Sequence, residues 1–453
     1  MHKLFRHPSL ERPCLRAVST MLLCLGLTGL AVAQSSSEPF HFGKVDLEFL
    51  DQIKQLDKKF EDRGLVYREP ELNAYVDRVG RSLIKADEPM ENVVWRFRVF
   101  RDPSVNAFAL PNGSIYVHTG LLALLENEAQ LAGVLAHEII HVRNRHSYLS
   151  YRSYRKKVLT ANIVTAVASA FGGGFQVGLA AQFMLTLSVI GYSRELEKEA
   201  DIEGARLMAA SPYDPKEMRA ALESLLPKYE VDLDGDPFYS DHPKTKDRIA
   251  YLNEWLSKSA PKRDTESAGL SIEDYLKNAA EATRHDIQLA IDAGMYRTAT
   301  ALGNRLVAAQ PDLASNLTAL ANSYTALGPR SPEPLPEEKT GHGKKEAGKR
   351  HSKLTLQEED RTLAATPAGQ ELQKANCAEA EKLYRRATEL EPNYAPAWRG
   401  LGELFEKQKQ SQQSIEAYHK YLELQPGAMD RLMIMRRVKA MESTNEHNEK
   451  TAE

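Results

Sequence analysis

The alternation of apolar and polar residues predicts short strands and longer helices in the first half of the chain. Residues 93–102, VVWRFRVFRD, alternate apolar and basic positions as a half-buried strand does. Residues 104–120, SVNAFALPNGSIYVHTG, predict two strands joined by a Pro-Asn-Gly turn. Residues 121–146 have helical spacing, with Asn127 as the expected cap between two helices. Between residues 40 and 255 we therefore expect many helices and one small sheet.

Residues 1–33 have the order of regions found in a secretory signal peptide. Basic residues precede an apolar run over residues 17–32, and Ala31, Val32 and Ala33 form the small-x-small pattern that signal peptidases cut. A membrane anchor is the alternative, but the run is short and the polar tract QSSS follows it directly. We expect a cleaved signal and a periplasmic mature protein.

A later stretch, residues 158–193, contains no charged residue. Glycines at 172–174 divide it, and polar residues dilute both halves, whereas a membrane span needs about 20 mainly apolar residues. We expect two buried helices. The alternative is a hairpin that makes a peripheral membrane contact through 158–193.

The C-terminal third repeats itself. The interval from Pro392 to Pro426 equals that from Tyr384 to Tyr418, and both match the period of tetratricopeptide (TPR) repeats. An earlier copy is indicated by Ala299, which precedes Pro311 by the same interval as Ala380 precedes Pro392. A charged, proline-rich insertion separates this earlier copy from the later ones, and we expect it to be disordered.

These patterns predict a predominantly helical α+β protein, in which a peptidase-like domain with a small β-sheet precedes an α-helical TPR solenoid. A chain that ends near Lys262 is expected to keep the chemistry of the first domain. The expected boundaries are 1–33 for the signal peptide, 34–262 for the first domain, 263–328 for the first TPR-like helices, 329–375 for the insertion, 376–441 for the TPR repeats and capping helix, and 442–453 for a polar tail.

Charge and cysteine content limit the classes of function and the covalent cross-links that the sequence allows. The formal net charge is −3, and loss of the basic signal peptide makes the remainder more acidic, which gives no support for nucleic-acid binding. Of the three cysteines, Cys14 and Cys24 leave with the signal and only Cys377 stays. The exported protein therefore has no internal disulfide.

The sequence HEIIH supplies the candidate chemistry. On a helix His137 and His141 project from one face and can bind one metal ion, while Glu138 can reach a water on that ion. A solvated helix face is the alternative reading. Glu197 and Asp201 also share a helix face, so one of them can complete the site while the other orients a histidine. Two histidines and one carboxylate leave a fourth position open, as in catalytic zinc sites.

Four ordered motifs, NAFALPNGSIYVHTGLL, HEIIH, ELEKEAD and SDHPKTKDRI, resemble the HtpX-like and CAAX prenyl protease family of zinc metallopeptidases, which are gluzincins. The signal peptide and TPR tail resemble its periplasmic branch. The resemblance implies one Zn²⁺ per chain held by His137, His141 and Glu197, with Glu138 as catalytic base. With Glu197 as the third ligand, Asp201 would orient one of the ligand histidines. The repeat array is short and interrupted compared with that branch.

Two further features are expected to serve catalysis. The strand Asn106, Ala107, Phe108 and Ala109 would be an exposed edge beside the metal that pairs with an extended substrate. His242, in the motif SDHPKTKDRI, is an oxyanion donor, a fourth zinc ligand that keeps the enzyme latent, or a structural residue at a helix start.

We therefore expect a periplasmic zinc endopeptidase that cleaves unfolded or misassembled proteins, in envelope quality control or outer-membrane protein assembly. Its TPR repeats would recruit a protein partner. The alternative is a TPR scaffold or chaperone whose peptidase domain is idle.

Overall fold

The computed structural model describes residues 40–84, 89–161, 183, 192–224, 245–260, 268–333 and 361–452. The expected signal peptide, most of the uncharged stretch, most of the charged insertion and His242 lie outside these residues. Within the described ranges, no helix combines the length and apolarity that crossing a membrane requires.

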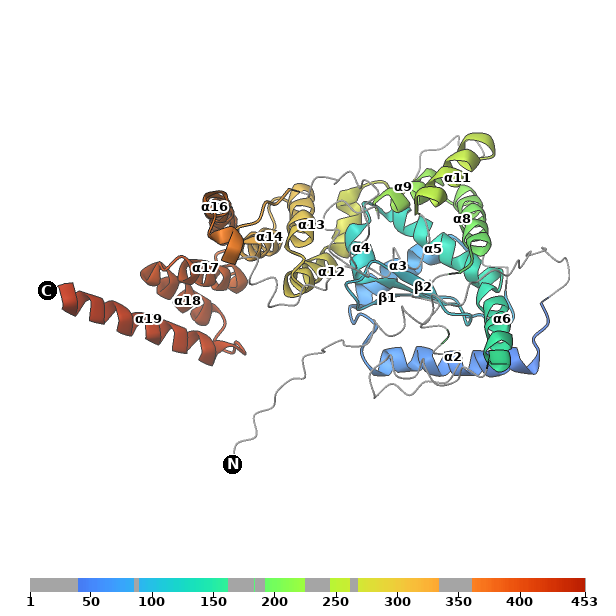
Figure 1. The fold of residues 1–453 in the computed structure, drawn as a ribbon, viewed down its shortest axis with the longest axis horizontal. Coiled ribbons are helices and arrows are strands. Elements are labelled where there is room, and N and C mark those ends of the chain that lie inside the picture. The colour runs from blue at the N-terminus through green and yellow to red at the C-terminus, as the bar shows by residue number, and fades with distance from the viewer. Residues whose placement is uncertain are drawn as a thin grey trace, which may run out of the picture.

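The N-terminal half consists of helices around one small sheet (Figure 1). Its helices are α2 (Lys44–Asp62), α3 (Pro70–Ser82), α4 (Thr119–Leu124), α5 (Glu128–Arg143), α6 (His146–Ala161), α8 (Arg194–Ala209), α9 (Lys216–Ser224) and α11 (Thr245–Lys258). Its strands are β1 (Arg96–Phe100), β2 (Ala107–Ala109) and β3 (Ser114–His118). The expected class, a predominantly helical α+β fold, is confirmed.

The three strands form a mixed sheet in the order β1-β3-β2. β2 and β3 pair antiparallel as the predicted hairpin, and β1 joins β3 in parallel. Side chains alternate between the two faces of the sheet because successive residues of a strand point in opposite directions. Ala107 and Val117 join the large core that includes α3 and α5, whereas Phe108 and Tyr116 join a second, aromatic cluster with α2.

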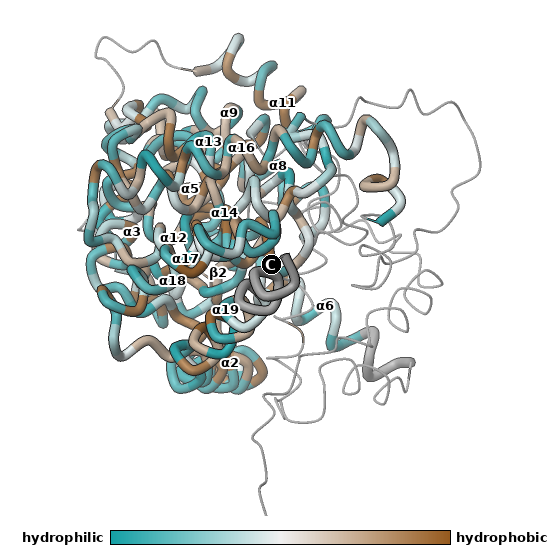
Figure 2. The backbone as a smooth tube through the Cα atoms, turned by 90° about the vertical axis from the view of Figure 1, so that its left-hand side faces the viewer, coloured by the Kyte–Doolittle hydropathy of each residue, from teal (hydrophilic) through white to brown (hydrophobic). Residues whose placement is uncertain are grey.

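The helices that cover the sheet differ in how much of their surface they bury. Helix α2 has one buried face, which includes Phe49, Ile53 and Phe60, and Figure 2 shows hydrophobic and hydrophilic residues alternating around it. Helix α5 is buried on every side between the sheet, α8 and α9. A motif on α5 is therefore placed inside the protein rather than on a solvated helix face.

The C-terminal half is a row of helices that pack in succession (Figure 1). Tyr384 and Tyr418, the pair one repeat period apart, are both buried between neighbouring helices. The helices are α12 (Ile272–Asp292), α13 (Tyr296–Ala309), α14 (Ala314–Leu327), α16 (Pro367–Leu390), α17 (Ala395–Lys407), α18 (Ser411–Leu424) and α19 (Arg431–Ala452).

The first helices of this row share a core with the sheet-containing half. Helix α12 packs against α4 and α3, and α12 and α13 contribute Tyr275, Leu276 and Leu306 to the same hydrophobic cluster as α5. Hydrogen bonds reinforce the junction. The Tyr275 hydroxyl donates to the Leu122 carbonyl over 2.7 Å, and Arg305 donates to the Ala123 carbonyl over 2.7 Å. This packing argues against a clean separation near Lys262.

We predict that a chain ending at residue 260 unfolds at a temperature about 10 °C or more below that of a chain ending at residue 333. The shorter chain exposes the apolar surface that Tyr275 and Leu276 cover, and burial of each such side chain is worth about 1.5–3 kcal/mol. Thermal unfolding of both chains measures the difference. Equal midpoints would show that the junction contributes little.

A buried carboxyl group at this junction gives a second prediction. Asp286 on α12 is 2 % exposed. Burial, and to a lesser extent the charge of Asp102, raises its pKa to about 8, although the Thr119 side chain acts to lower that pKa. The folded chain then keeps a proton that the unfolded chain releases above about pH 4. Stability is therefore lost as the pH rises from about 4 to 8.

Asp286→Asn should remove this loss, so the variant should gain up to about 1.4 kcal/mol on the wild type per pH unit across that window. Urea unfolding between pH 4.5 and 8 measures the two slopes, and Asp292→Asn, an exposed position on the same helix, is the control. If wild type and Asp286→Asn keep parallel profiles, the carboxyl group is ionised in the folded chain.

Candidate metal centre

Two helices cross closely enough to bring the HEIIH motif and the ELEKEAD motif together. Asn127 caps α5 as predicted, accepting a hydrogen bond from the Gln130 amide over 2.8 Å. Where α8 crosses α5, a Cβ atom at Gly204 would lie 3.2 Å from the backbone nitrogen of His137 and 2.7 Å from the Met218 side chain. A glycine at position 204 therefore lets the backbones approach beside the first histidine.

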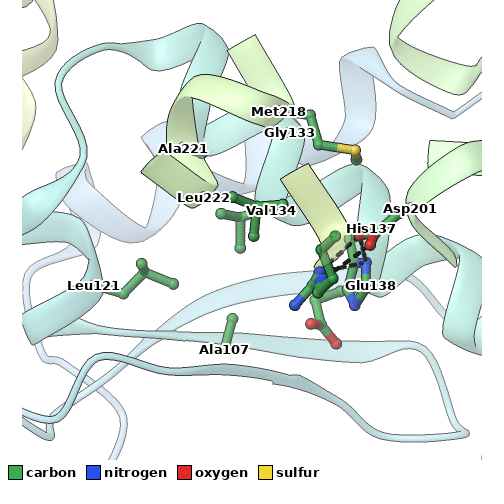
Figure 3. A pocket seen from close by; sticks show the side chains of 11 residues that line it. Ala107, Leu121, Gly133, Val134, His137, Glu138, Asp201, Met218, Ala221 and Leu222 are labelled. Carbon is green, nitrogen blue, oxygen red and sulfur yellow. Dashed lines mark hydrogen bonds and ion pairs between the residues drawn. The ribbon is translucent and has the colours of Figure 1, made fainter. Parts of the chain in front are cut away.

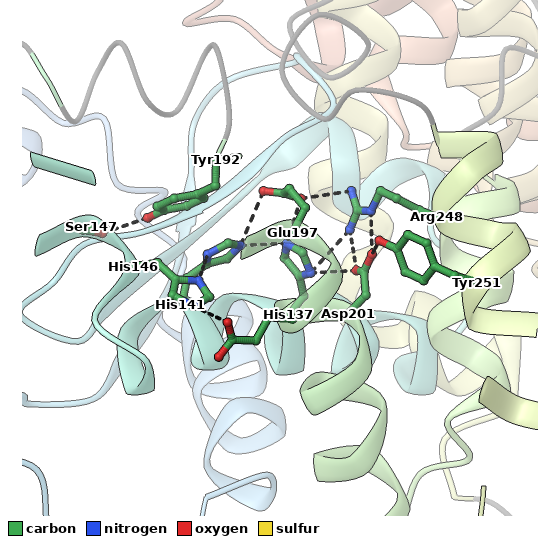
Figure 4. Close-up of polar contacts among 10 residues, drawn as sticks. His137, His141, His146, Ser147, Tyr192, Glu197, Asp201, Arg248 and Tyr251 are labelled. Carbon is green, nitrogen blue, oxygen red and sulfur yellow. Dashed lines mark hydrogen bonds and ion pairs between the residues drawn. The ribbon is translucent and has the colours of Figure 1, made fainter. Parts of the chain in front are cut away.

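The crossing brings His137, His141 and Glu197 to one point, and each is at most 5 % exposed. The two Nε2 atoms of the histidines lie 3.0 Å apart. The Glu197 carboxylate oxygens lie 3.5 Å from His137 Nε2 and 3.6 Å from His141 Nε2 (Figure 4). One atom from each residue lies within 4.8 Å of the others, so the three residues could hold a metal ion. Two imidazoles and a carboxylate are the donor set of catalytic zinc sites with an open position.

Asp201 lies behind this triplet, where it contacts His137 rather than the point of convergence. Its carboxylate is 2.8 Å from His137 Nδ1 and accepts two hydrogen bonds from Arg248, over 2.7 and 2.8 Å. The Tyr251 hydroxyl donates to the same carboxylate. Both partners come from α11, in the TKDRIAY segment that continues the SDHPKTKDRI motif. Neither Arg248 nor Tyr251 was predicted to contact Asp201.

The charges around the histidines are strongly coupled. Burial alone would raise the pKa of Asp201, but Arg248 and His137 outweigh it and hold that pKa below its ordinary value. Burial alone would lower the pKa of His137, but the Asp201 carboxylate raises it. In the metal-free chain His137 is thus favoured to hold a proton, which a bound cation would replace.

The second histidine, His141, has different surroundings. Its Nδ1 atom lies 2.8 Å from Nδ1 of His146, and its ring stacks on Tyr192 with centroids 3.9 Å apart. The Tyr192 hydroxyl is 2.7 Å from Ser147 Oγ. Burial, with the nearby His137 adding to it, lowers the pKa of His146 to about 4. Neither His146 nor Tyr192 was predicted to belong to the site.

Glu199 is less exposed than its sequence surroundings predict. Its place in a charge-rich helix predicts a solvated side chain, as it does for Glu195 and Lys198, which are exposed. Glu199 is instead half-buried and accepts a hydrogen bond from Asn144 over 2.6 Å. It also lies 3.7 Å from His146.

A cavity of about 30 Å³, large enough to hold a water molecule, opens beside His137 and Glu138. Figure 3 shows the Glu138 side chain reaching toward β2, which carries Ala107. The other walls are largely apolar side chains of α4, α5 and α9, namely Leu121, Val134, Met218, Ala221 and Leu222.

The expected substrate strand requires a correction. Asn106, Ala107, Phe108 and Ala109 are between 4 and 9 % exposed as whole residues, so the strand is buried rather than exposed. β2 is nevertheless at the edge of the described sheet. Because these exposed fractions include the backbone, an extended substrate could pair with the outer edge of β2 only once that edge is uncovered.

Comparison with known proteins relates this part of the chain to metallopeptidases. Residues 67–256 match the sequence profile described as Peptidase family M48. The mitochondrial metalloendopeptidase OMA1 of Schizosaccharomyces pombe is 32 % identical over 231 residues, which are 49 % of this chain and 66 % of that protein. The β-barrel assembly-enhancing protease of Escherichia coli is 30 % identical over 193 residues, 40 % of this chain and 38 % of that protein.

A putative β-barrel assembly-enhancing protease of Vibrio cholerae is 29 % identical over 202 residues, 43 % of this chain and 41 % of that protein. The matched segments thus span between 38 and 66 % of the length of these three relatives. Among solved structures, yeast Tom70 aligns with 89 % of this chain at 10 % identity, but its TM-score of 0.16 is too low to indicate a shared fold.

We predict that Asp201→Asn weakens metal binding about 10–100-fold, because a ligand histidine loses the carboxylate that orients it. It should also lower the free energy of unfolding by about 3–5 kcal/mol, because Arg248 stays buried without its partner. Chelator competition and urea unfolding measure the two effects. Glu203→Gln, at a half-buried position of α8 that pairs with Arg206, is the control. A variant as good as wild type in both assays would contradict the assignment.

Proposed function

We propose that the chain, which carries a peptidase domain of family M48 at residues 67–256, is a zinc-dependent endopeptidase. The observation that supports the proposal most strongly is the buried convergence of His137, His141 and Glu197. Because this donor set matches catalytic zinc, we assign the three residues as ligands of one Zn²⁺.

Glu138 has the position of a general base. It follows the first ligand on α5 and lines the cavity beside it, so a water molecule there can lie within its reach. Bound zinc would supply Lewis acidity, which polarises a peptide carbonyl and makes water a better nucleophile. Glu138 takes a proton from the attacking water and passes it to the nitrogen of the leaving amine.

The backbone of β2 is the proposed binding surface for substrate. The His118 amide donates to the Asn106 carbonyl, and the Leu110 amide donates to the Ser114 carbonyl, so these positions face β3. In an antiparallel ladder the intervening residues alternate, and the backbone groups of Ala107 and Ala109 therefore face the outer edge. Ala107 also lines the cavity beside Glu138. An extended peptide that adds to this edge would pass the proposed base.

This mode of binding selects a class of substrate. Strand addition reads the backbone, so it requires a segment that is free of its own secondary structure. Unfolded or misassembled proteins present such segments. We therefore assign the protein to quality control in the bacterial envelope, exported by residues 1–33, with the helical row of α12–α19 recruiting a protein partner.

We predict that Glu138→Gln abolishes cleavage of casein by the full chain while zinc binding changes by less than about threefold, because a base that is not a ligand can be removed without loss of the ion. Glu197→Ala should lose both properties. Metal content and release of labelled peptides are measured on the same samples, with and without chelator.

Loss of zinc from Glu138→Gln would show that Glu138 is a ligand. Wild-type protein that binds zinc but leaves casein and other unfolded proteins intact would instead favour a repeat scaffold with an idle peptidase domain.

A further inference from the structure

The two histidines of the proposed zinc site have different partners on their outer ring nitrogens. His137 contacts the Asp201 carboxylate, whereas the Nδ1 atom of His141 lies 2.8 Å from Nδ1 of His146 (Figure 4). His146 is 1 % exposed and lies in the first turn of α6. The second contact therefore joins two imidazoles, in which only one nitrogen can donate the hydrogen bond.

The direction of this hydrogen bond follows from the inner side of the site. Nε2 of His141 points at His137 and Glu197, so it must carry a lone pair if it is to bind the ion. The proton of neutral His141 is then on Nδ1 and is donated to His146. Nδ1 of His146 must therefore be an acceptor, which places the His146 proton on Nε2.

The protein offers a carboxylate on that side of His146. Nε2 of His146 lies 3.7 Å from the Glu199 carboxylate, which is held in turn by the Asn144 side chain over 2.6 Å. Asn144 is at the C-terminus of α5 and Glu199 is on α8. The two helices that carry the proposed ligands thus also carry the residues that surround His146.

The backbone between the histidines is bent to make this contact. Arg145 has a φ of 57°, a left-handed conformation that is unfavourable for a non-glycine residue. Its side chain is 9 % exposed, donates to the Glu91 carbonyl over 2.9 Å and lies 5.0 Å from the Phe42 ring centroid. These contacts hold the turn that points His146 back at His141. Conformations of this kind persist at functional sites where the surroundings enforce them.

We propose that His146 is a positioning residue that fixes the tautomer and orientation of His141, while the negative charge of Glu199, 3.7 Å from Nε2 of His146, favours a proton on that nitrogen. The inference rests on the proposed zinc site. A carboxylate orients one ligand, and a neutral imidazole orients the other. A neutral acceptor adds no negative charge behind His141, so a bound cation keeps more of its Lewis acidity than it would with two carboxylates.

Nitrogen-15 NMR of the zinc-loaded full chain, labelled at histidine, tests the proton positions directly. The missing signals of His146→Asn identify the ring of His146. We expect His146 to be neutral with its proton on Nε2 and with Nδ1 accepting a hydrogen bond. A proton on Nδ1 of His146 would overturn the proposal. This result is read from the wild-type protein, so it does not depend on the folding of a variant.

Zinc affinity tests the consequence with two side chains of similar size. His146→Asn keeps an oxygen acceptor near the place of Nδ1, whereas His146→Leu has none. Chelator competition should show a loss of about 10–100-fold for leucine and recovery to within about threefold of wild type for asparagine. Equal affinities in the two variants, whether both are high or both are low, would reduce His146 to a packing residue.

Glu199→Ala should weaken zinc binding less than His146→Leu, because Glu199 acts on the ligand only through His146 and over a distance of 3.7 Å. Glu203→Ala on the same helix is the control, since Glu203 is half-buried and paired with Arg206. An unchanged affinity in Glu199→Ala would remove Glu199 from the chain of contacts. Wild-type protein that binds no zinc would contradict the proposed function itself. Zinc-loaded protein in which His146 has its proton on Nδ1 would contradict only the role of His146.

Discussion

Burial of charge is the constraint on which this structure depends. Among the described residues, three carboxylates (Glu138, Glu197 and Asp201) and one guanidinium (Arg248) surround two imidazoles, and each of these side chains is at most 5 % exposed. An isolated charge in such a place costs several kcal/mol. The guanidinium offsets one carboxylate, and a divalent cation would offset the other two. Without that cation the cluster is favoured to take up protons, in agreement with the raised pKa of His137.

The rest of the N-terminal half holds these groups in place. Helix α5 is buried all round, which places its motif inside the protein, and Gly204 lets α8 approach it. Helix α11 supplies Arg248 from a position far along the chain from HEIIH. The sheet places an edge strand beside the cavity, and α12 closes the core on the other side of α4. The helical row is thus attached to the sheet-containing half through its core.

The sequence predicts the parts of the site that depend on local geometry. His137 and His141 share a helix face because they are one helical turn apart, and the same spacing places Glu197 and Asp201 together. Arg248 and Glu199 could not be assigned in this way, because their partners come from other helices. His146 is near in sequence, but its contact depends on the left-handed turn at Arg145, which the residue type does not indicate. The burial of β2 was missed because an alternating pattern does not show what covers each face.

The proposed function requires that His137, His141 and Glu197 hold one zinc ion. X-ray absorption at the zinc edge of the purified full chain tests it most directly. We expect one zinc per chain, a shell of nitrogen and oxygen atoms at about 2.0–2.1 Å, and the outer scattering of two imidazoles. A sulfur shell at about 2.3 Å, or zinc without imidazole scattering, would contradict it.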